Sequence, residues 1–248
     1  MKKTIKKAAI LFAVISVIFA FATPVLAAQS EQALLKAANS GNKNAMFELA
    51  QFYLYEKKDE IKASQWFKKA ADAGHVDAMY AMSSIVAFFA NSPELAIKWT
   101  EKAANNGHPQ AMYEMVERCE KQDDYKKAIS WLEKTAKTND EFLQGKAIKK
   151  LVYYYLKGQK GADNKKSVLP DETKAIKWAE KLNKEDKIQV ACLIGECYYG
   201  VSGDIKLERN LTKAKKWFNI AKTAGHESEF LKQIILIENE EKIRKIAK

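Results

Sequence analysis

All five tryptophans of this 248-residue chain stand in the same local frame, and this register constrains the fold more than any other feature. Each lies three residues after an alanine and four residues before a small or apolar residue, which is the spacing of one face of an α-helix. The segments recur at intervals of 32 to 47 residues, so the sequence predicts an array of similar helical units, each with one such helix, helix B. The five segments are KASQWFKKAADAG (62–74), LAIKWTEKAANNG (95–107), KAISWLEKTAKTN (127–139), KAIKWAEKLNKED (174–186) and KAKKWFNIAKTAG (213–225).

A second helix, helix A, precedes each helix B. Its frame begins with alanine or valine and places larger residues four and eight positions later. The fifteen frame residues are Ala45, Leu49, Tyr53, Ala78, Met82, Val86, Ala111, Met115, Cys119, Ala147, Leu151, Tyr155, Val190, Ile194 and Tyr198. Pro93 and Pro109 stand near first helical positions, where the missing N–H costs little. Glycines that suit a left-handed helix end are Gly41, Gly74, Gly107 and Gly225.

With these residues the chain resembles the Sel-one-like repeat (SLR) family, relatives of the tetratricopeptide repeat. Ile194-Gly195 with Tyr198 matches the family's helix A, and Lys98-Trp99 with the following KAA and glycine matches its helix B. The resemblance implies an all-α fold, a right-handed α/α superhelical solenoid of about five helix-pair repeats that is used for protein–protein contact. The glycine of helix A is replaced by larger residues in the other repeats, so a looser approach of A to B is expected there.

The expected domain organisation has three parts after a leader. Residues 28–43 read as an N-terminal cap, 44–226 as the repeats and 227–248 as a C-terminal capping helix, because terminal repeats need polar caps. A membrane-surface helix is the alternative for the tail.

Residues 1–27 resemble a secretory signal peptide, with a basic start, a 15-residue apolar run and a small-residue end. Cleavage is expected after Ala27, which places the mature chain in the periplasm or outside the cell. An uncleaved membrane anchor is the alternative, although the run is short for a bilayer span.

The charge balance argues against nucleic acid as a partner. The net charge falls from +11 to +7 when the four lysines of the leader are removed, and only three of the 42 basic residues are arginines. Arginine is the preferred side chain for forked recognition of phosphate. Lysines spread over every segment indicate solvated faces.

The cysteines and histidines do not point to a metal or a cofactor. Cys119, Cys192 and Cys197 are expected to be free or buried thiols, because an exported disulfide-held domain would carry more cysteines in even number. Each histidine follows the glycine that ends a helix B or its turn. The three, His75, His108 and His226, are therefore interpreted as one structural device used three times. No cofactor is expected.

One motif keeps an enzymatic alternative open. Ser40 and Lys43 form an S-x-x-K match, and cysteine-rich secreted relatives of the family have been linked to β-lactam binding and hydrolysis. The K-T-G and S-D-N motifs that accompany such a serine are absent, as are the relatives' cysteine pairs. The expectation is therefore that the protein is not an enzyme.

Helix A supplies the candidate contact surface. If its first frame residue is position 1, positions 1, 5, 8, 9 and 12 share the core face and positions 3, 4, 7, 10 and 11 point away from it. In the family, helix A lines the concave side. The candidate protein-binding residues are Phe47, Glu48, Tyr55, Tyr80, Phe88, Tyr113, Glu114, Glu117 and Tyr153. The alternative is that these rings pack between neighbouring repeats as ordinary core.

The sequence thus predicts a non-enzymatic scaffold of the bacterial envelope that binds another protein or peptide. An adaptor, a host-interaction factor and an immunity protein against a secreted lipase toxin are the roles known for such proteins. The sequence does not choose among them.

Overall fold

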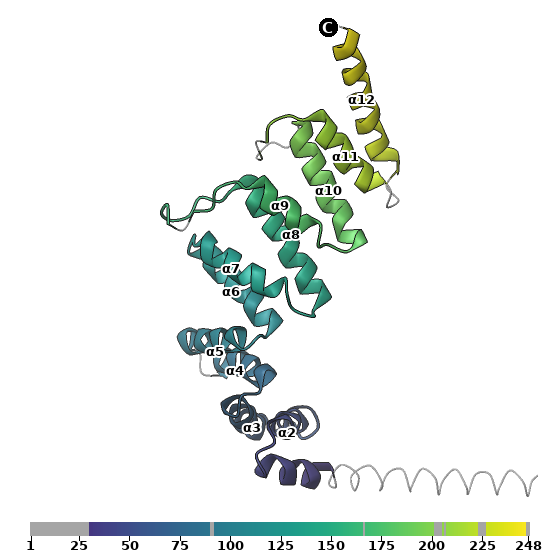
Figure 1. The fold of residues 1–248 in the computed structure, drawn as a ribbon. Helices are drawn as coiled ribbons and strands as arrows, with labels where there is room; N and C mark the ends of the chain where they lie inside the picture. Colours follow the sequence, from purple (N-terminus) through teal and green to yellow (C-terminus); the bar gives the residue numbers. More distant parts are fainter. Residues whose placement is uncertain are drawn as a thin grey trace, which may run out of the picture. The chain divides into compact units, whose positions relative to one another are not determined.

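The structure is a computed structural model that describes residues 30–89, 92–165, 167–200, 205, 207–222 and 227–246 (Figure 1). The expected leader, its cleavage point, Gly225 and His226 lie outside these residues. The chain divides into two compact units, Met1–Asn106 and Gly107–Lys248. Apart from one isolated bridge, the regular secondary structure of the described residues is helical.

Unit 1 holds the first two helix pairs. After a helical segment at residues 30–39, its helices are α2 (Lys43–Tyr55), α3 (Glu60–Asp72), α4 (Val76–Phe89) and α5 (Pro93–Asn105). Helices α2 and α4 are the predicted A helices, and each packs against the B helix that follows it. Helix α3 also contacts α4, which joins the two pairs. The segment 30–39 is tied to α2 because the hydroxyl of Tyr53 donates to Glu31 Oε1 at 2.9 Å.

Unit 2 holds the other three pairs and a final helix. Its helices are α6 (Pro109–Lys121), α7 (Tyr125–Thr135), α8 (Glu141–Lys157), α9 (Glu172–Ala179), α10 (Lys184–Tyr199), α11 (Leu211–Lys222) and α12 (Glu227–Ile246). The even-numbered helices α6, α8 and α10 are A helices, each packed on its B helix. Helix α12 packs on α11 through the buried Ile234 and Ile237, and Lys215 pairs with Glu238 at 2.8 Å.

The A-helix frame is confirmed at every position, because all fifteen frame residues are buried. The B-helix frame is confirmed in part. Trp66, Trp131 and Trp217 are buried, whereas Trp99 and Trp178 are only half-buried. Within unit 1, α5 packs mainly against α4, and α9 has eight residues and packs mainly on α8. These two tryptophans therefore have fewer neighbours to cover them.

The helix ends follow the sequence signals. Pro93 and Pro109 are the first residues of α5 and α6. Gly74 adopts a φ of 87°, a left-handed value that glycine reaches without steric cost, and it lets the chain leave α3 and enter α4 through a connection of three residues, 73–75.

Gly195 marks a close approach of helices A and B in the last pair. A Cβ atom at this position would lie 2.8 Å from the ring of Phe218 on α11. The side chains that replace this glycine in the other repeats, Ala50, Ser83, Val116 and Val152, are themselves buried.

The polar segment between α8 and α9 is an ordered turn at its base. Gln159 and Val168 form an antiparallel bridge with N–H···O distances of 2.8 and 2.7 Å. The backbone N–H of Asp171 donates to the carbonyl of Tyr155 at 2.7 Å, which fixes the start of α9 against the end of α8. None of the helices within the described ranges has both the length and the apolar character needed to cross a membrane.

Candidate protein-binding surface

The aromatic rings at position 3 of helix A are buried or half-buried rather than exposed. Phe47 stacks on the ring of His75 with centroids 4.3 Å apart and meets Phe67 edge-on at 5.6 Å, so it is half-buried between the first and second repeats. Tyr80 is also half-buried. Tyr113 is 4% exposed, and Lys146 of α8 lies over its ring at 4.2 Å.

The expectation that Tyr113 points away from the core is therefore wrong, and the alternative of ordinary core packing holds for it. The periodicity of α6 predicts which of its faces contacts α7, the other helix of the same pair. The opposite face of α6 is covered by α8 of the next pair, and the periodicity of α6 does not predict this contact. Burial raises the pKa of Tyr113 to about 12, with a further contribution from the nearby Glu120 and Glu117 carboxylates, so its hydroxyl stays protonated at neutral pH.

The rings at position 11 are the exposed ones. Tyr55 is 60% exposed at the end of α2, and Phe88 is 81% exposed at the end of α4. Both belong to unit 1 and occupy the same place in consecutive A helices. Three further apolar side chains that flank the same two A–B turns are exposed, namely Ile61, Phe89 and Leu95. Together these five residues are called here the turn-edge strip.

The layout of unit 1 explains why the strip lies on one edge. Successive helices joined by short turns run antiparallel, so the last residues of α2 and α4 are expected on the same edge of the unit. Phe88 and Phe89 meet edge to face with ring centroids 4.9 Å apart.

Three members of the strip were missed by sequence reasoning. Position 12 was assigned to the core, yet Phe89 at that position is 57% exposed because α4 ends there. Ile61 and Leu95 precede the alanines of their helix B frames and fall in first turns. One sequence signal could have identified all three: an apolar residue that lies next to an A–B turn and is not one of the frame residues of helix A or helix B.

The remaining candidates are charged or paired. Glu48 and Glu117 are exposed, and Glu114 is half-buried. Tyr153 is half-buried, and Lys157 Nζ donates to its hydroxyl at 3.1 Å.

An ion-pair cluster between α6 and α8 organises the middle of unit 2. Glu120 accepts from the hydroxyl of the buried Tyr154 and from Lys150 Nζ at 2.7 Å. Burial, followed by the bond to Glu120, raises the pKa of Tyr154. The ring of Tyr125 packs against Tyr154 edge-on at 5.6 Å. The side chains of this cluster therefore hold α6, α7 and α8 together.

The S-x-x-K residues do not form a nucleophile–base pair. The hydroxyl of Ser40 donates to the carbonyl of Ala37 at 2.7 Å, and Lys43 Nζ donates to the carbonyl of Gly74 at 3.1 Å. Both groups therefore satisfy backbone carbonyls at helix ends.

The two described histidines act as helix caps. His75 Nδ1 accepts from the backbone N–H of Ala78 at 3.3 Å, and His108 Nδ1 accepts from that of Ala111 at 3.2 Å. The interpretation as a repeated structural device is thus supported for these two. Within the described part of the chain, no three histidine, cysteine or acidic side chains gather as a metal site would require.

The cysteines have ordinary packing environments. Cys119 and Cys197 are buried and Cys192 is half-buried, and all three are free thiols. Cys192 Sγ donates to the carbonyl of Ile188 at 3.0 Å, and burial raises the pKa of Cys119.

The protein is an all-α array of helix pairs with a recurrent Ala-x-x-Trp frame. No catalytic group is assembled among the described residues, and this architecture is that of a repeat scaffold. The Sel1 repeat model matches the chain five times, at residues 43–75, 76–108, 117–140, 147–185 and 190–226. The chain belongs to the Sel1 repeat family, the family that its sequence resembles.

Several solved structures are similar to this chain. A Sel1 repeat protein from Oxalobacter formigenes is 23% identical, with a TM-score of 0.50 over 78% of this chain and 77% of that one. A protective antigen with an SLR fold from uropathogenic Escherichia coli is 24% identical, with a TM-score of 0.48. This chain covers 44% of that antigen's length, and the antigen aligns with 86% of this chain. An immunity protein from Pseudomonas aeruginosa is 17% identical, with a TM-score of 0.38 over 78% of this chain and 73% of that one. No curated protein matches the chain in sequence.

Proposed function

We propose that the protein is a non-enzymatic scaffold that is exported to the bacterial envelope and binds a partner protein through the turn-edge strip. The observation that carries this proposal is the repeated exposure of an aromatic ring, Tyr55 and then Phe88, at the same place in two consecutive A helices. Large exposed apolar side chains gathered in one place are typical of protein-binding sites. Aromatic rings supply much contact area and lose little entropy when they are fixed.

The composition of the strip suits a protein partner. Its five side chains are apolar or aromatic, and the turn between Tyr55 and Ile61 adds charged residues of both signs (56–60). An apolar centre with a mixed polar rim is the usual anatomy of a protein interface.

The export part of the proposal is supported by the sequence of residues 1–27 alone. It is tested by expressing the full chain in its native host or a related bacterium and sequencing the N-terminus of the product. A mature chain that begins at Ala28 supports export, and a product that keeps the apolar run contradicts the proposed cleavage.

Affinity capture tests the binding proposal. The wild-type protein, the double variant Tyr55→Ser with Phe88→Ser, and the control variant Phe142→Ser serve as baits against envelope extract of the native host. Phe142 is 77% exposed at the start of α8, outside the strip, so it controls for general stickiness of an exposed ring.

The expected result is a protein that the wild type and the control variant retain and the double variant loses. A lipase toxin as the retained protein would define an immunity role, and an envelope or host protein would define an adaptor or host-interaction role. Equal retention by all three baits would contradict the assignment of binding to the strip.

A further inference from the structure

The solvent-facing side of the B helices of unit 2 carries a regular array of lysines. Relative to each tryptophan, the residues four before, one before and three after lie three or four positions apart, so they form one stripe on the helix surface. In and directly after α7, α9 and α11, seven of these nine positions are lysines and none is acidic. The seven lysines, called here the lysine array, are Lys127, Lys134, Lys174, Lys177, Lys181, Lys213 and Lys216.

The lysine array is exposed and only partly neutralised. All seven side chains are exposed. Two of them form ion pairs, Lys174 with Asp171 at 3.2 Å and Lys213 with Glu172 at 2.6 Å. The other five have no ion-pair partner within the described ranges, and α11 itself has four lysines and no acidic residue. The array therefore keeps an excess of positive charge.

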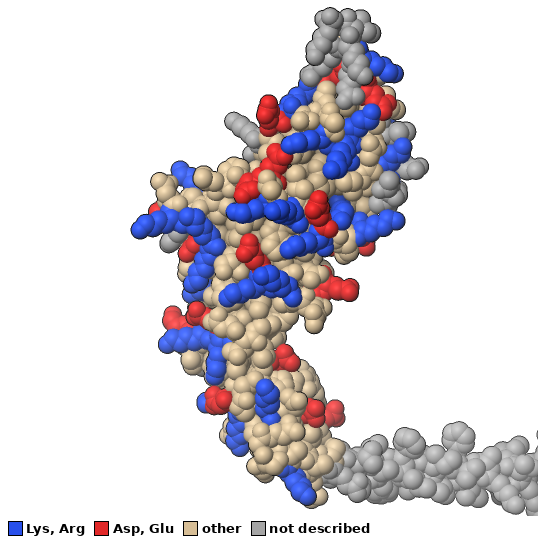
Figure 2. Space-filling view, in the orientation of Figure 1, with Lys and Arg blue, Asp and Glu red and all other residues tan. Residues whose placement is uncertain are grey.

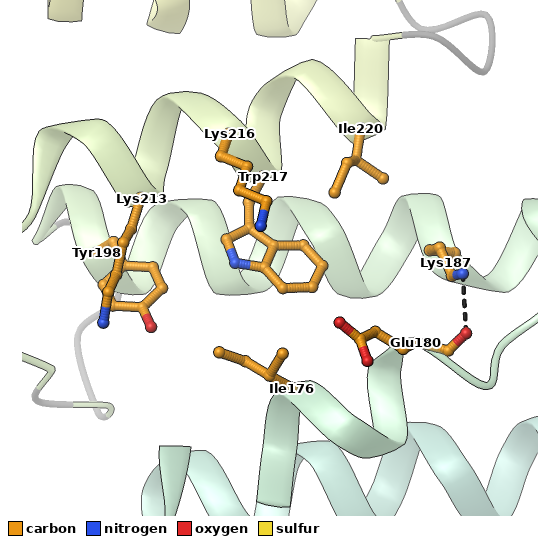
Figure 3. A pocket seen from close by; sticks show the side chains of 8 residues that line it. All are labelled: Ile176, Glu180, Lys187, Tyr198, Lys213, Lys216, Trp217 and Ile220. Carbon is orange, nitrogen blue, oxygen red and sulfur yellow. Dashed lines mark hydrogen bonds between the residues drawn. The ribbon is translucent and has the colours of Figure 1, made fainter. Parts of the chain in front are cut away.

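Contacts between the helices join the three stripes into one face. Residues of α7 and α9 line the same cleft beside the α8–α9 segment. Lys213 of α11 reaches Glu172 of α9, and Figure 3 shows Trp217 of α11 opposite Ile176 of α9 with Lys216 beside it. Figure 2 shows rows of lysine side chains across one face of unit 2, with fewer acidic side chains between them. The charges are thus arranged in two dimensions rather than in a single row.

Four lysines of the array contact aromatic rings, and three do not. The Nζ atoms of the four lie 3.9 to 5.3 Å from the ring centroids of Trp131, Tyr155, Trp178 and Tyr198. Such cation–π contacts help to hold a helix pair together. Lys127, Lys177 and Lys216, one on each helix, have neither a ring contact nor an ion pair among the described residues. Packing within the repeats therefore does not account for these three lysines.

The composition of the array favours a membrane surface over a protein or a nucleic acid. The centres of protein interfaces are depleted in lysine, and the one apolar residue at the nine positions is Ile220. Arginine is the preferred side chain for nucleic-acid phosphates, and the array has none. A bilayer with anionic lipids presents a two-dimensional layer of negative charge, which attracts each nearby lysine by a similar amount.

We propose that the lysine array of unit 2 docks the protein on the surface of a bilayer that contains anionic phospholipids. The ammonium groups lie at the level of the lipid head groups. The helices do not enter the acyl chains, because the stripe lacks the apolar residues that interfacial helices insert. The array shares no residue with the turn-edge strip, so the two surfaces can be tested separately.

Vesicle co-sedimentation tests this proposal. The full chain is used as its host processes it, with vesicles of phosphatidylcholine that contain about 30% phosphatidylglycerol and with vesicles of phosphatidylcholine alone. The neutral vesicles report any binding that residues 1–27 contribute. At about 0.1 M salt we expect at least about tenfold stronger binding to the anionic vesicles, and at about 0.5 M salt we expect release, because salt screens exposed charges.

A matched pair of triple variants assigns the contact. The array variant carries Lys127→Glu, Lys177→Glu and Lys216→Glu. The control variant has the same change in net charge at exposed lysines outside the array, with Lys36→Glu, Lys121→Glu and Lys184→Glu. We expect the array variant to bind the anionic vesicles at least about 30-fold more weakly than the wild type, and the control to stay within about fivefold. Circular dichroism should show that both variants melt like the wild type.

Equal binding of the wild type to anionic and neutral vesicles, or retained binding by the array variant, would overturn the proposal. An equal loss in both variants would also overturn it, because net charge alone would then explain the attraction. Soluble polyglutamate, added at the same concentration of negative charge as the vesicles, should leave the protein on the anionic vesicles. Release by polyglutamate would contradict the bilayer as the ligand and favour an acidic protein. None of these measurements involves the turn-edge strip.

Discussion

At the scale of single residues, the tryptophans differ in burial although the sequence places them in the same frame. Trp131 packs between α7 and its neighbours with 5% of its surface exposed, whereas Trp99 is half-buried on α5. The destabilisation caused by truncating a large core side chain depends on how much contact is removed and how large a cavity remains.

We therefore expect Trp131→Ala to lower the free energy of unfolding by about 3–5 kcal/mol, and Trp99→Ala to lower it by clearly less. Urea unfolding monitored by circular dichroism compares the two variants with the wild type. An equal decrease in the free energy of unfolding for both variants would show that the difference in burial between Trp131 and Trp99 does not affect stability.

His75 gives a prediction about pH. Its Nδ1 must be unprotonated to accept from Ala78, and burial, aided by Lys43, lowers its pKa below the ordinary 6.5. Below pH 6.5 the unfolded chain binds more protons at His75 than the folded chain does. The contribution of neutral His75 to the free energy of unfolding is therefore complete above pH 6.5, and it is lost as the pH falls through the pKa of His75 in the folded protein.

The variant His75→Asn keeps a capping side chain but does not titrate. We expect the urea midpoint of the wild type to fall more between pH 7.5 and pH 5.5 than that of His75→Asn. The same fall in both proteins would mean that His75 does not carry the pH dependence.

At the scale of helices, Gly195 tests how closely A and B approach in the last pair. Alanine normally stabilises a helix interior by about 1 kcal/mol over glycine. At Gly195 the added methyl group would meet the ring of Phe218, which is buried and cannot easily move. Gly195→Ala is therefore expected to lower the melting temperature.

Gly145 of α8 is the matched control. A Cβ there would meet Oδ2 at the far end of the Asp186 side chain, which is less buried than the ring of Phe218, although it pairs with Lys149 at 2.6 Å. Gly145→Ala should leave the melting temperature unchanged or raise it. A drop as large as that of Gly195→Ala would contradict the claim that Gly195→Ala destabilises the protein through the close approach of helices A and B.

The segment between α8 and α9 should tolerate shortening. Because Gln159 and Val168 already form an antiparallel bridge, replacing residues 160–167 with Asn-Gly would close a two-residue hairpin turn. Shortening a surface loop changes the closure entropy only slightly, so the free energy of unfolding should change by less than about 1 kcal/mol. Urea unfolding measures this, and a loss of several kcal/mol would show that the segment holds α8 and α9 together.

Helix periodicity predicted the inner face of the A helices but not the outer one. The frame at Ala45, Leu49 and Tyr53 and its four counterparts is buried throughout, because contact between paired helices follows from residue spacing alone. The burial of Tyr113 depends on α8, which lies in the next repeat, and no pattern within α6 contains that information. Tyr55 and Phe88 kept the expected exposure, yet Phe89 could not be placed without knowing where α4 ends.

At the scale of the whole molecule, the protein consists of pairs that contact mainly their neighbours, within two compact units. The stability of such arrays is approximately a sum of local terms, so damage in one repeat should stay close to it. We expect Trp66→Ala to speed amide hydrogen exchange in α2–α5 and to leave α10 and α11 protected. Uniform acceleration across the chain would indicate one cooperative fold.

The account as a whole depends on the turn-edge strip as the place where a protein partner binds. The most direct test is the binding free energy of the captured partner, measured by titration calorimetry for the wild type, the double variant Tyr55→Ser with Phe88→Ser, and the control Phe142→Ser. Loss of two anchoring rings should weaken binding by at least about 2 kcal/mol, or roughly 30-fold, while the control stays within about 0.5 kcal/mol of the wild type. Equal affinity of the double variant and the wild type, with both proteins folded, would contradict the account.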